Sequence, residues 1–229
     1  MLTDIQKRTA EAIVNIFETG RVRGDYACVT RLKGDSGGLT YGRSQTTLMS
    51  GNLHELIASY CAAPEATFAG RLDPYLSRLA ASDKVLDTDE NFHALLREAG
   101  GDPLMHRAQD EFFDRRYWMP AAEEAARLGL EGALSFATVY DSFIHGSWAR
   151  MRDRTTKAAG APEACGERRW IETYLRTRRA WLAGHANRLL RRTVYRMDAL
   201  TLLAEEGNWP LDLPLTVRDR TITLKELWF

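Results

Sequence analysis

Two carboxylates near the N-terminus have the residue types and the spacing that could cleave a glycosidic bond. Glu18 stands at the end of an amphipathic segment, and Asp35 lies seventeen residues later (35 − 18), in the glycine-rich run 34–42 with the sequence GDSGGLTYG. One carboxyl group can protonate the leaving oxygen while the other handles water or the sugar. We therefore expect the two side chains to face each other across a cleft.

A helix is expected to carry the first carboxylate. Thr3 and Gln6 fit a capping box at its start, and apolar residues follow at helical spacing as far as Phe17. Gly20 is a natural C-terminal stop. Glu18 should therefore lie in the last helical turn, next to apolar neighbours that favour the protonated form an acid needs.

The second carboxylate is expected on a turn between strands. Residues 26–32 and 39–47 alternate well enough to predict two strands on either side of the glycine-rich turn. Asp35 would then lie on an exposed turn, where it stays ionised and can accept a proton from water.

The rest of the chain reads as helical. Residues 132–144 (GALSFATVYDSFI) are apolar on nearly every face and predict a buried central helix, and residues 215–224 predict a hairpin that turns at Asp219. We expect a single domain over residues 1–229, mainly α with a small N-terminal β element. Helices are predicted over residues 52–62, 65–81, 89–98, 103–117, 120–128, 131–145, 166–183 and 186–206.

Ser36 invites a competing interpretation that the sequence does not support. Residues 34–38 match both a serine-protease nucleophile loop and the nucleophile elbow of α/β-hydrolases. A chymotrypsin-like enzyme needs its histidine before the serine, and no histidine precedes Ser36. An elbow must be followed by a helix, whereas residues 39–42 read as extended. We therefore reject a serine hydrolase.

Metal, nucleotide and nucleic-acid chemistry find no support in the sequence. The five histidines form no ligand spacing, and His145, one turn after Asp141, is best interpreted as a structural histidine. Three cysteines without metal-like spacing suit reduced thiols. The 31 basic and 31 acidic residues cancel, which gives no field to recruit nucleic acid. We expect no cofactor, no metal and no nucleic-acid partner.

The start of the sequence bears on where the protein acts. The first seventeen residues carry charges throughout, which is not typical of a signal peptide, and no apolar stretch is long enough to insert into a membrane. We expect synthesis in the cytoplasm and action on a cell wall after export, lysis or delivery as an antibacterial effector. The sequence does not indicate whether an immunity or inhibitor protein exists.

Several separated segments together resemble one known group of enzymes. The residues that carry the resemblance are Glu18 at the end of the first helix, the run 34–42 with Asp35, Thr40 and Gly42, the segment NLHELI at 52–57, the stretch 120–145 with Tyr140 and Asp141, the segments at 172–175 and 178–180, and Gly207-Asn208 before the final hairpin. In this order they resemble the chitosanase family of glycoside hydrolases, family 46, within the lysozyme-like superfamily. The resemblance runs from about residue 11 to the hairpin.

The resemblance implies a fold and a set of residue roles. The fold would be lysozyme-like α+β, with two helical lobes around a long buried helix and the β element lining the cleft. Glu18 would be the general acid and Asp35 the general base of an inverting, endo-acting glycosidase, and the hydroxyl of Thr40 would help to hold the attacking water. In an inverting enzyme the two carboxyls stand ~6.5–9.5 Å apart or somewhat more.

Further positions follow from the same resemblance. A buried charge network supporting the acid would consist of Asp141, Arg178 and Arg188. Tyr41 and Asn52 would contact the substrate. The family usually has an arginine soon after the catalytic aspartate, and this chain has Ser36 and Gly37 there.

The position of Asn52 shapes the predicted substrate. The family places an acidic residue there to grip the amine of glucosamine, and an amide removes that charge. An N-acetylated sugar suits a neutral amide. We therefore predict cleavage of β-1,4 bonds in an amino-sugar polymer, with bacterial peptidoglycan favoured and chitosan as the alternative.

Two other classes stay open at this point. A catalytically silent glycan-binding protein could keep the fold without the chemistry. A lytic transglycosylase would need Glu18 but not Asp35, and it would release a 1,6-anhydro product instead of a reducing end formed by water.

Overall fold

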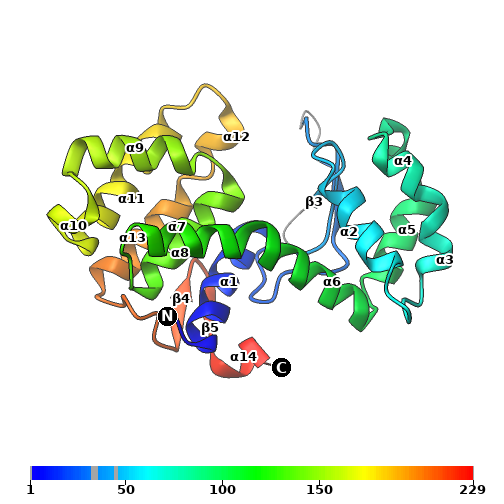
Figure 1. The fold of residues 1–229 in the computed structure, drawn as a ribbon, viewed down its shortest axis with the longest axis horizontal. Coiled ribbons are helices and arrows are strands. Elements are labelled where there is room, and N and C mark those ends of the chain that lie inside the picture. The colour runs from blue at the N-terminus through cyan, green and yellow to red at the C-terminus, as the bar shows by residue number, and fades with distance from the viewer. Residues whose placement is uncertain (1, 32–35, 44–45, 229) are drawn as a thin grey trace. The chain divides into compact units, whose positions relative to one another are not determined.

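The chain forms two compact units in a computed structural model that describes residues 2–31, 36–43 and 46–228 (Figure 1). Unit 1 comprises Met1–Phe17 and Arg116–Phe229, and unit 2 comprises Glu18–Arg115. The chain leaves unit 1 near the end of its first helix and returns within the π-helix η3 (Asp114–Trp118). The expectation of one domain in two lobes stays a prediction.

Unit 2 contains the small sheet. Strands β1 (Val29–Arg31), β2 (Leu39–Tyr41) and β3 (Thr46–Thr47) pair antiparallel in the order β1-β2-β3. The prediction of one strand over residues 39–47 is wrong, because the chain turns at Gly42, where φ is +83°. A Cβ at this position would lie 2.3 Å from Oε1 of Gln109, so only glycine fits.

Short helices make up most of the rest of unit 2. They are α2 (Asn52–Cys61), α3 (Ala69–Leu72), η1 (Asp73–Tyr75), α4 (Leu76–Ala80), η2 (Lys84–Thr88), α5 (Glu90–Ala99) and α6 (Pro103–Phe113). The helix predicted over residues 65–81 is broken into pieces, since Pro74 falls in its middle and lacks an N–H for the helical ladder. Asp89 and Asp102 cap α5 and α6, where their carboxylates accept backbone N–H bonds.

Unit 1 contains the longest helices, α1 and α11, together with several shorter ones. They are α1 (Asp4–Thr19), which continues into unit 2 after Phe17, then α7 (Met119–Arg127), α8 (Ala133–His145), α9 (Trp148–Ala159), α10 (Pro162–Cys165), α11 (Glu167–Ala183), α12 (Arg188–Arg191), α13 (Tyr195–Glu205) and α14 (Leu224–Trp228). The predicted capping box forms: Thr3 N–H donates to Oε1 of Gln6 at 3.0 Å, and Gln6 N–H donates to Oγ1 of Thr3 at 3.2 Å. The prediction that α8 is buried is confirmed.

Three parts of unit 1 can be compared directly with the sequence prediction. Helix α9 was not predicted, because its exposed face is dense in charge, yet Trp148, Met151 and Thr155 are buried at helical spacing. The helix predicted over residues 186–206 is divided into α12 and α13. The predicted hairpin forms as β4 (Leu215–Val217) and β5 (Arg220–Ile222), with Arg218 at a φ of +57° in the turn.

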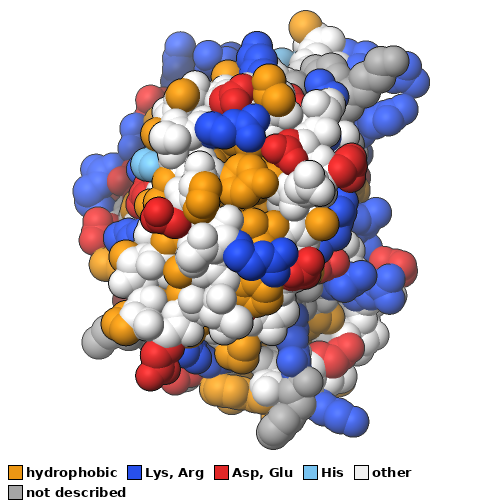
Figure 2. All heavy atoms as spheres, turned by 90° about the vertical axis from the view of Figure 1, so that its right-hand side faces the viewer, with side chains coloured by type: hydrophobic (Ala, Val, Ile, Leu, Met, Phe, Trp, Pro, Cys, Tyr) orange, Lys and Arg blue, Asp and Glu red, His pale blue; other side chains and the backbone are white. Residues whose placement is uncertain are grey.

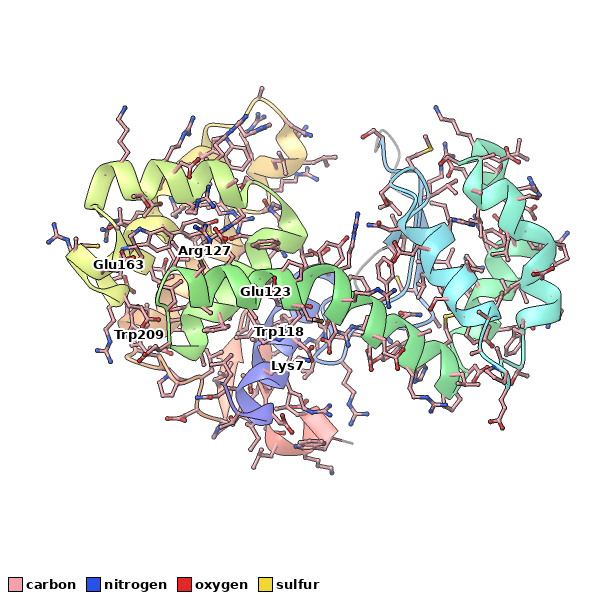
Figure 3. The ribbon with its side chains drawn as sticks, in the orientation of Figure 1. Lys7, Trp118, Glu123, Arg127, Glu163 and Trp209 are labelled. Carbon is pink, nitrogen blue, oxygen red and sulfur yellow. The ribbon has the colours of Figure 1, made fainter. Side chains whose placement is uncertain are left out.

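Aromatic side chains join the helices of unit 1. Trp118 meets Tyr140 of α8 edge to face, with ring centroids 5.1 Å apart. Figure 3 shows Lys7 of α1 beside Trp118, and its Nζ lies 5.5 Å from the ring centroid. A second cluster joins α9 to α11, where Trp148 packs against Trp170 and Tyr174. These contacts fix α1, α8, α9 and α11 within one core.

The protein is therefore mainly helical with small antiparallel sheets, and this part of the predicted fold class is confirmed. The face in Figure 2 mixes acidic, basic and apolar side chains, as the balanced composition predicts. Among the described residues, no helix is both long and apolar enough to cross a membrane. The same residues contain no group of three or more His, Cys, Asp and Glu side chains that could hold a metal ion.

Candidate active site

A buried carboxylate in unit 1 binds two arginines. Asp141 of α8 is completely buried. Its Oδ2 accepts a hydrogen bond from Nη1 of Arg178 at 2.8 Å, and its Oδ1 accepts from Nη2 of Arg196 at 2.6 Å. Burial alone would raise the pKa of Asp141, but Arg196 and Arg178 outweigh it, and the pKa is lowered. The site therefore holds an ionised carboxylate between two buried cations.

The second arginine of this network corrects the sequence assignment. Arg188 begins the short helix α12 and is exposed. Arg196, on the first turn of α13, is 2% exposed and reaches Asp141 through both Nε and Nη2. The prediction that placed Arg188 in the network is wrong because α12 ends and the chain turns before α13 begins, which brings a residue eight positions later (196 − 188) to the carboxylate.

The network continues from Arg178 to the end of α8. Arg178 Nη1 donates to Oγ of Ser142 at 2.7 Å, and Ser142 also accepts from the hydroxyl of Tyr174 at 2.8 Å. Nη2 of Arg178 donates to Nδ1 of His145 at 3.0 Å, so the neutral ring carries its proton on Nε2. Burial, with the charge of Arg196, lowers the pKa of His145 to about 3. His145 therefore stays neutral near physiological pH.

The same network contacts the residue that precedes Glu18. The guanidinium carbon of Arg196 lies 5.0 Å from the ring centroid of Phe17. Tyr195 donates its hydroxyl proton to the carbonyl oxygen of Phe17 at 2.8 Å, and the two rings meet edge to face at 5.9 Å. This carbonyl lies near the C-terminus of α1, where helical carbonyls lack intrahelical partners. The end of α1 that carries Glu18 is thus fixed from α13.

The structure describes only part of the predicted catalytic set. Glu18 follows Phe17 in the last turn of α1 and is half-buried. Asp35 lies outside the described residues. Thr40, in the middle of β2, is 5% exposed, and its Oγ1 donates to the carbonyl oxygen of Thr30 at 3.1 Å. The two threonine hydroxyls are also 2.6 Å apart, so the Thr40 oxygen has a fixed position.

The two predicted substrate contacts differ in exposure. Tyr41 is completely buried, and burial raises the pKa of its hydroxyl. Its ring belongs to the core of unit 2, so the prediction that it contacts substrate is wrong; strand alternation does not hold here because β2 is buried on both faces. Asn52 is half-buried at the start of α2, after Gly51 in a left-handed conformation, and it stays a candidate for substrate contact.

Comparison with known proteins defines the family. The sequence model of glycosyl hydrolase family 46 matches residues 12–215, which is most of the chain. The chain belongs to glycosyl hydrolase family 46. The resemblance seen in the sequence is confirmed, and this family 46 protein is a glycosidase with a lysozyme-like α+β fold.

Relatives of this family 46 protein have been named and solved. A chitosanase of Bacillus subtilis (strain 168) is 32% identical over 228 residues, covering 93% of this chain and 82% of the relative. The crystal structure of native chitosanase from Bacillus subtilis MY002 superposes with a TM-score of 0.85 at 31% identity, covering 97% of this chain and 100% of that one. A family 46 chitosanase of Gynuella sunshinyii in complex with chitotetraose has a TM-score of 0.85 at 28% identity, covering 98% and 99%.

Sequence reasoning missed two members of this family 46 site. Arg196 and Tyr195 follow one another at the start of α13 and reach Asp141 and Phe17, 55 and 178 residues away along the chain. Spacing cannot show which of several arginines in residues 176–196 faces a distant carboxylate.

Proposed function

We propose that this protein is a chitosanase that hydrolyses β-1,4 bonds within chitosan. The observation that carries the proposal is the 32% identity to a chitosanase over 93% of the chain. Two structural relatives add weight: one is the Gynuella chitosanase solved with chitotetraose, and the other is a glutamate-to-alanine variant of the Bacillus chitosanase solved with six GlcN units. The substrate class is therefore a polymer of glucosamine.

The residues support a direct displacement by water. Glu18 donates a proton to the glycosidic oxygen as the C1–O bond breaks, and Asp35 accepts a proton from the water that forms the new C1–O bond. The hydroxyl oxygen of Thr40, positioned by Thr30, accepts a hydrogen bond from this water and orients it. Attack from the face opposite the leaving group inverts the anomeric configuration.

The comparisons favour chitosan over the peptidoglycan predicted from Asn52. The argument for peptidoglycan was that an amide lacks the charge that attracts an amine. An asparagine carbonyl oxygen still accepts a hydrogen bond from a protonated amine, so the amide is compatible with glucosamine. The relatives that support chitosan as the substrate are themselves named as chitosanases.

Product analysis on two polymers tests the proposal. The purified protein is incubated with chitosan and, separately, with peptidoglycan, and new reducing ends and product masses are measured. We expect glucosamine oligomers from chitosan, α-anomers in NMR spectra taken immediately after cleavage, and no release from peptidoglycan. Reducing ends from peptidoglycan alone would refute chitosan as the substrate. Products with a 1,6-anhydro end would indicate a lytic transglycosylase.

Two substitutions test the residue roles. Glu18→Gln and Asp35→Asn should each lower kcat on chitosan by about 10²–10⁴-fold, because each removes one proton transfer. Glu98→Gln is the matched control, since it changes a half-exposed carboxylate that pairs with Arg71 on the surface of unit 2. A protein that binds chitosan but releases no product would instead support the silent glycan-binding class.

A further inference from the structure

One buried carboxylate in unit 2 contacts both ends of the segment that carries Asp35. Asp87 lies in η2 and is 9% exposed. Its Oδ1 accepts a hydrogen bond from the backbone N–H of Leu39 at 2.7 Å, and its Oδ2 lies 3.3 Å from Nε of Arg31. No sequence pattern singles out Asp87, which is 48 residues from Leu39.

The two residues bound by Asp87 form the last rung of a hairpin. Arg31 of β1 is paired with Leu39 of β2, and this is the pair at the end of the β1–β2 ladder. Asp35 is four residues after Arg31 and four residues before Leu39 in the sequence (35 − 31 and 39 − 35). Fixing this rung therefore fixes the points where the chain enters and leaves the segment around Asp35. We call the pair Arg31–Leu39, together with the neighbouring pair Thr30–Thr40, the stem.

The backbone is shaped to admit this carboxylate. Gly38 has a φ of +69°, and a Cβ at this position would lie 2.9 Å from Oδ1 of Asp87. A side chain here would both strain the backbone and push the carboxylate away from the Leu39 N–H. Gly38 thus permits the close approach of η2 to β2.

The two contacts of Asp87 differ in strength. The hydrogen bond from the Leu39 N–H to the carboxylate oxygen is short and buried, and hydrogen bonds to carboxylates are among the stronger kinds in proteins. The Arg31 side chain is 51% exposed, so solvent weakens the ion pair. The bond to Leu39 is therefore the contact that holds the stem, and Arg31 adds to it.

We propose that Asp87 is a positioning residue for the predicted general base. It holds the stem so that Asp35 reaches the attacking water in a fixed geometry, and it does not itself touch the substrate. The proposal rests on the proposed function, in which Asp35 is the base. A misplacement of about 1 Å at a reacting group can lower a rate about 10²-fold, which is the scale of effect expected from a loosened stem.

Kinetics of two Asp87 variants on chitosan test the proposal. Asp87→Ala removes both contacts and should lower kcat about 10²-fold while KM changes by less than about threefold, because the substrate contacts stay in place. Asp87→Asn keeps an oxygen for the Leu39 N–H and should recover most of the lost kcat. Arg31→Met should have the smallest effect of the three.

Asp83→Ala is the matched control. Asp83 caps the same η2, accepts from Val85 N–H at 3.0 Å and pairs with Arg78, but none of these contacts involves the stem. We expect this variant to lose stability with kcat unchanged. An unchanged kcat in folded Asp87→Ala would overturn the proposal, and so would an equal loss of kcat in Asp83→Ala at equal stability.

Amide hydrogen exchange separates this proposal from the proposed function. In Asp87→Ala, exchange at the Leu39 amide should accelerate at least about tenfold, while the amide of Leu48, which donates to the Leu39 carbonyl at 2.8 Å, changes less. This result is independent of substrate. If exchange is faster in Asp87→Ala but the wild-type protein is inactive on chitosan, the stem contact is supported and the proposed function is refuted. Unchanged exchange in Asp87→Ala would refute the stem contact itself.

Discussion

The charge network of unit 1 and the stem of unit 2 are built from different kinds of contact. In unit 1, Asp141 is buried between Arg178 and Arg196, and Arg196 packs on the residue before Glu18. In unit 2, strands β1 and β2, which precede and follow Asp35 in the sequence, are three residues long. They are held together by the hydroxyls of Thr30 and Thr40 and by Asp87.

The difference between these regions lies in what each contact costs to break. Removing one partner from a buried ion network leaves uncompensated charge in the core, so stability and activity are lost together. Removing a hydroxyl bond from a short hairpin costs less stability, because it breaks a hydrogen bond between neutral groups and leaves no buried charge. Substitutions should therefore separate folding from catalysis in the stem and couple them in the Asp141 network.

The largest effect is expected for Asp141→Asn. It leaves two buried arginines without their counter-charge and should lower the free energy of unfolding by about 3–5 kcal/mol, measured by urea denaturation. A triple variant with Asp141→Leu, Arg178→Met and Arg196→Met should regain much of that stability while kcat stays low. If the triple variant regains kcat as well, the network serves folding alone.

An intermediate effect is expected at Glu124, a second ion cluster of unit 1 that does not contact Asp141. Hydrogen bonds from Arg127 and from Arg152 lower the pKa of Glu124 to about 2. Burial raises this pKa, but by less than the hydrogen bonds lower it. Because the folded pKa lies below the unfolded value of 4.5, Glu124 stabilises the fold above pH 4.5, and this contribution is lost as the pH falls toward 2. Glu124→Gln should lower the free energy of unfolding by about 1–2 kcal/mol at pH 7.

Unfolding curves at several pH values check the Glu124 prediction. The difference between wild type and Glu124→Gln should shrink between pH 4.5 and pH 2, with kcat on chitosan unchanged at pH 7. A difference that stays constant over this range would show that the charge of Glu124 does not matter. A loss of kcat would show that unit 1 couples folding to catalysis beyond the Asp141 network.

The smallest effect on stability is expected for the hydroxyl pair of the stem. Thr40→Val and Thr30→Val each remove one hydroxyl of the pair and should each cost about 1 kcal/mol in the free energy of unfolding. Only Thr40 is proposed to orient water, so Thr40→Val should lower kcat at least about tenfold, and Thr30→Val clearly less. Equal kcat losses in the two variants would assign the effect to the stem rather than to the water.

Much of the fold could be predicted from the sequence because it is encoded locally. The capping box of Thr3 and Gln6, the buried helix α8 and the hairpin β4–β5 depend on neighbours within a few residues, and all three form as predicted. The helix α9 was missed because its charged face obscures the buried positions Trp148 and Met151.

The features of the site likewise divide into those that the sequence indicates and those that depend on residues far apart in the chain. Three features could be inferred without the fold: the family, the helix whose last turn carries Glu18, and the participation of Asp141 and Arg178 in one buried pair. The folded chain was needed to show that Arg196, and not Arg188, completes this pair, that the ring of Tyr41 is internal, and that Asp87 binds the stem. Each of these depends on residues 48 or more positions apart, or on which face of a short strand is covered, and neither periodicity nor spacing carries that information.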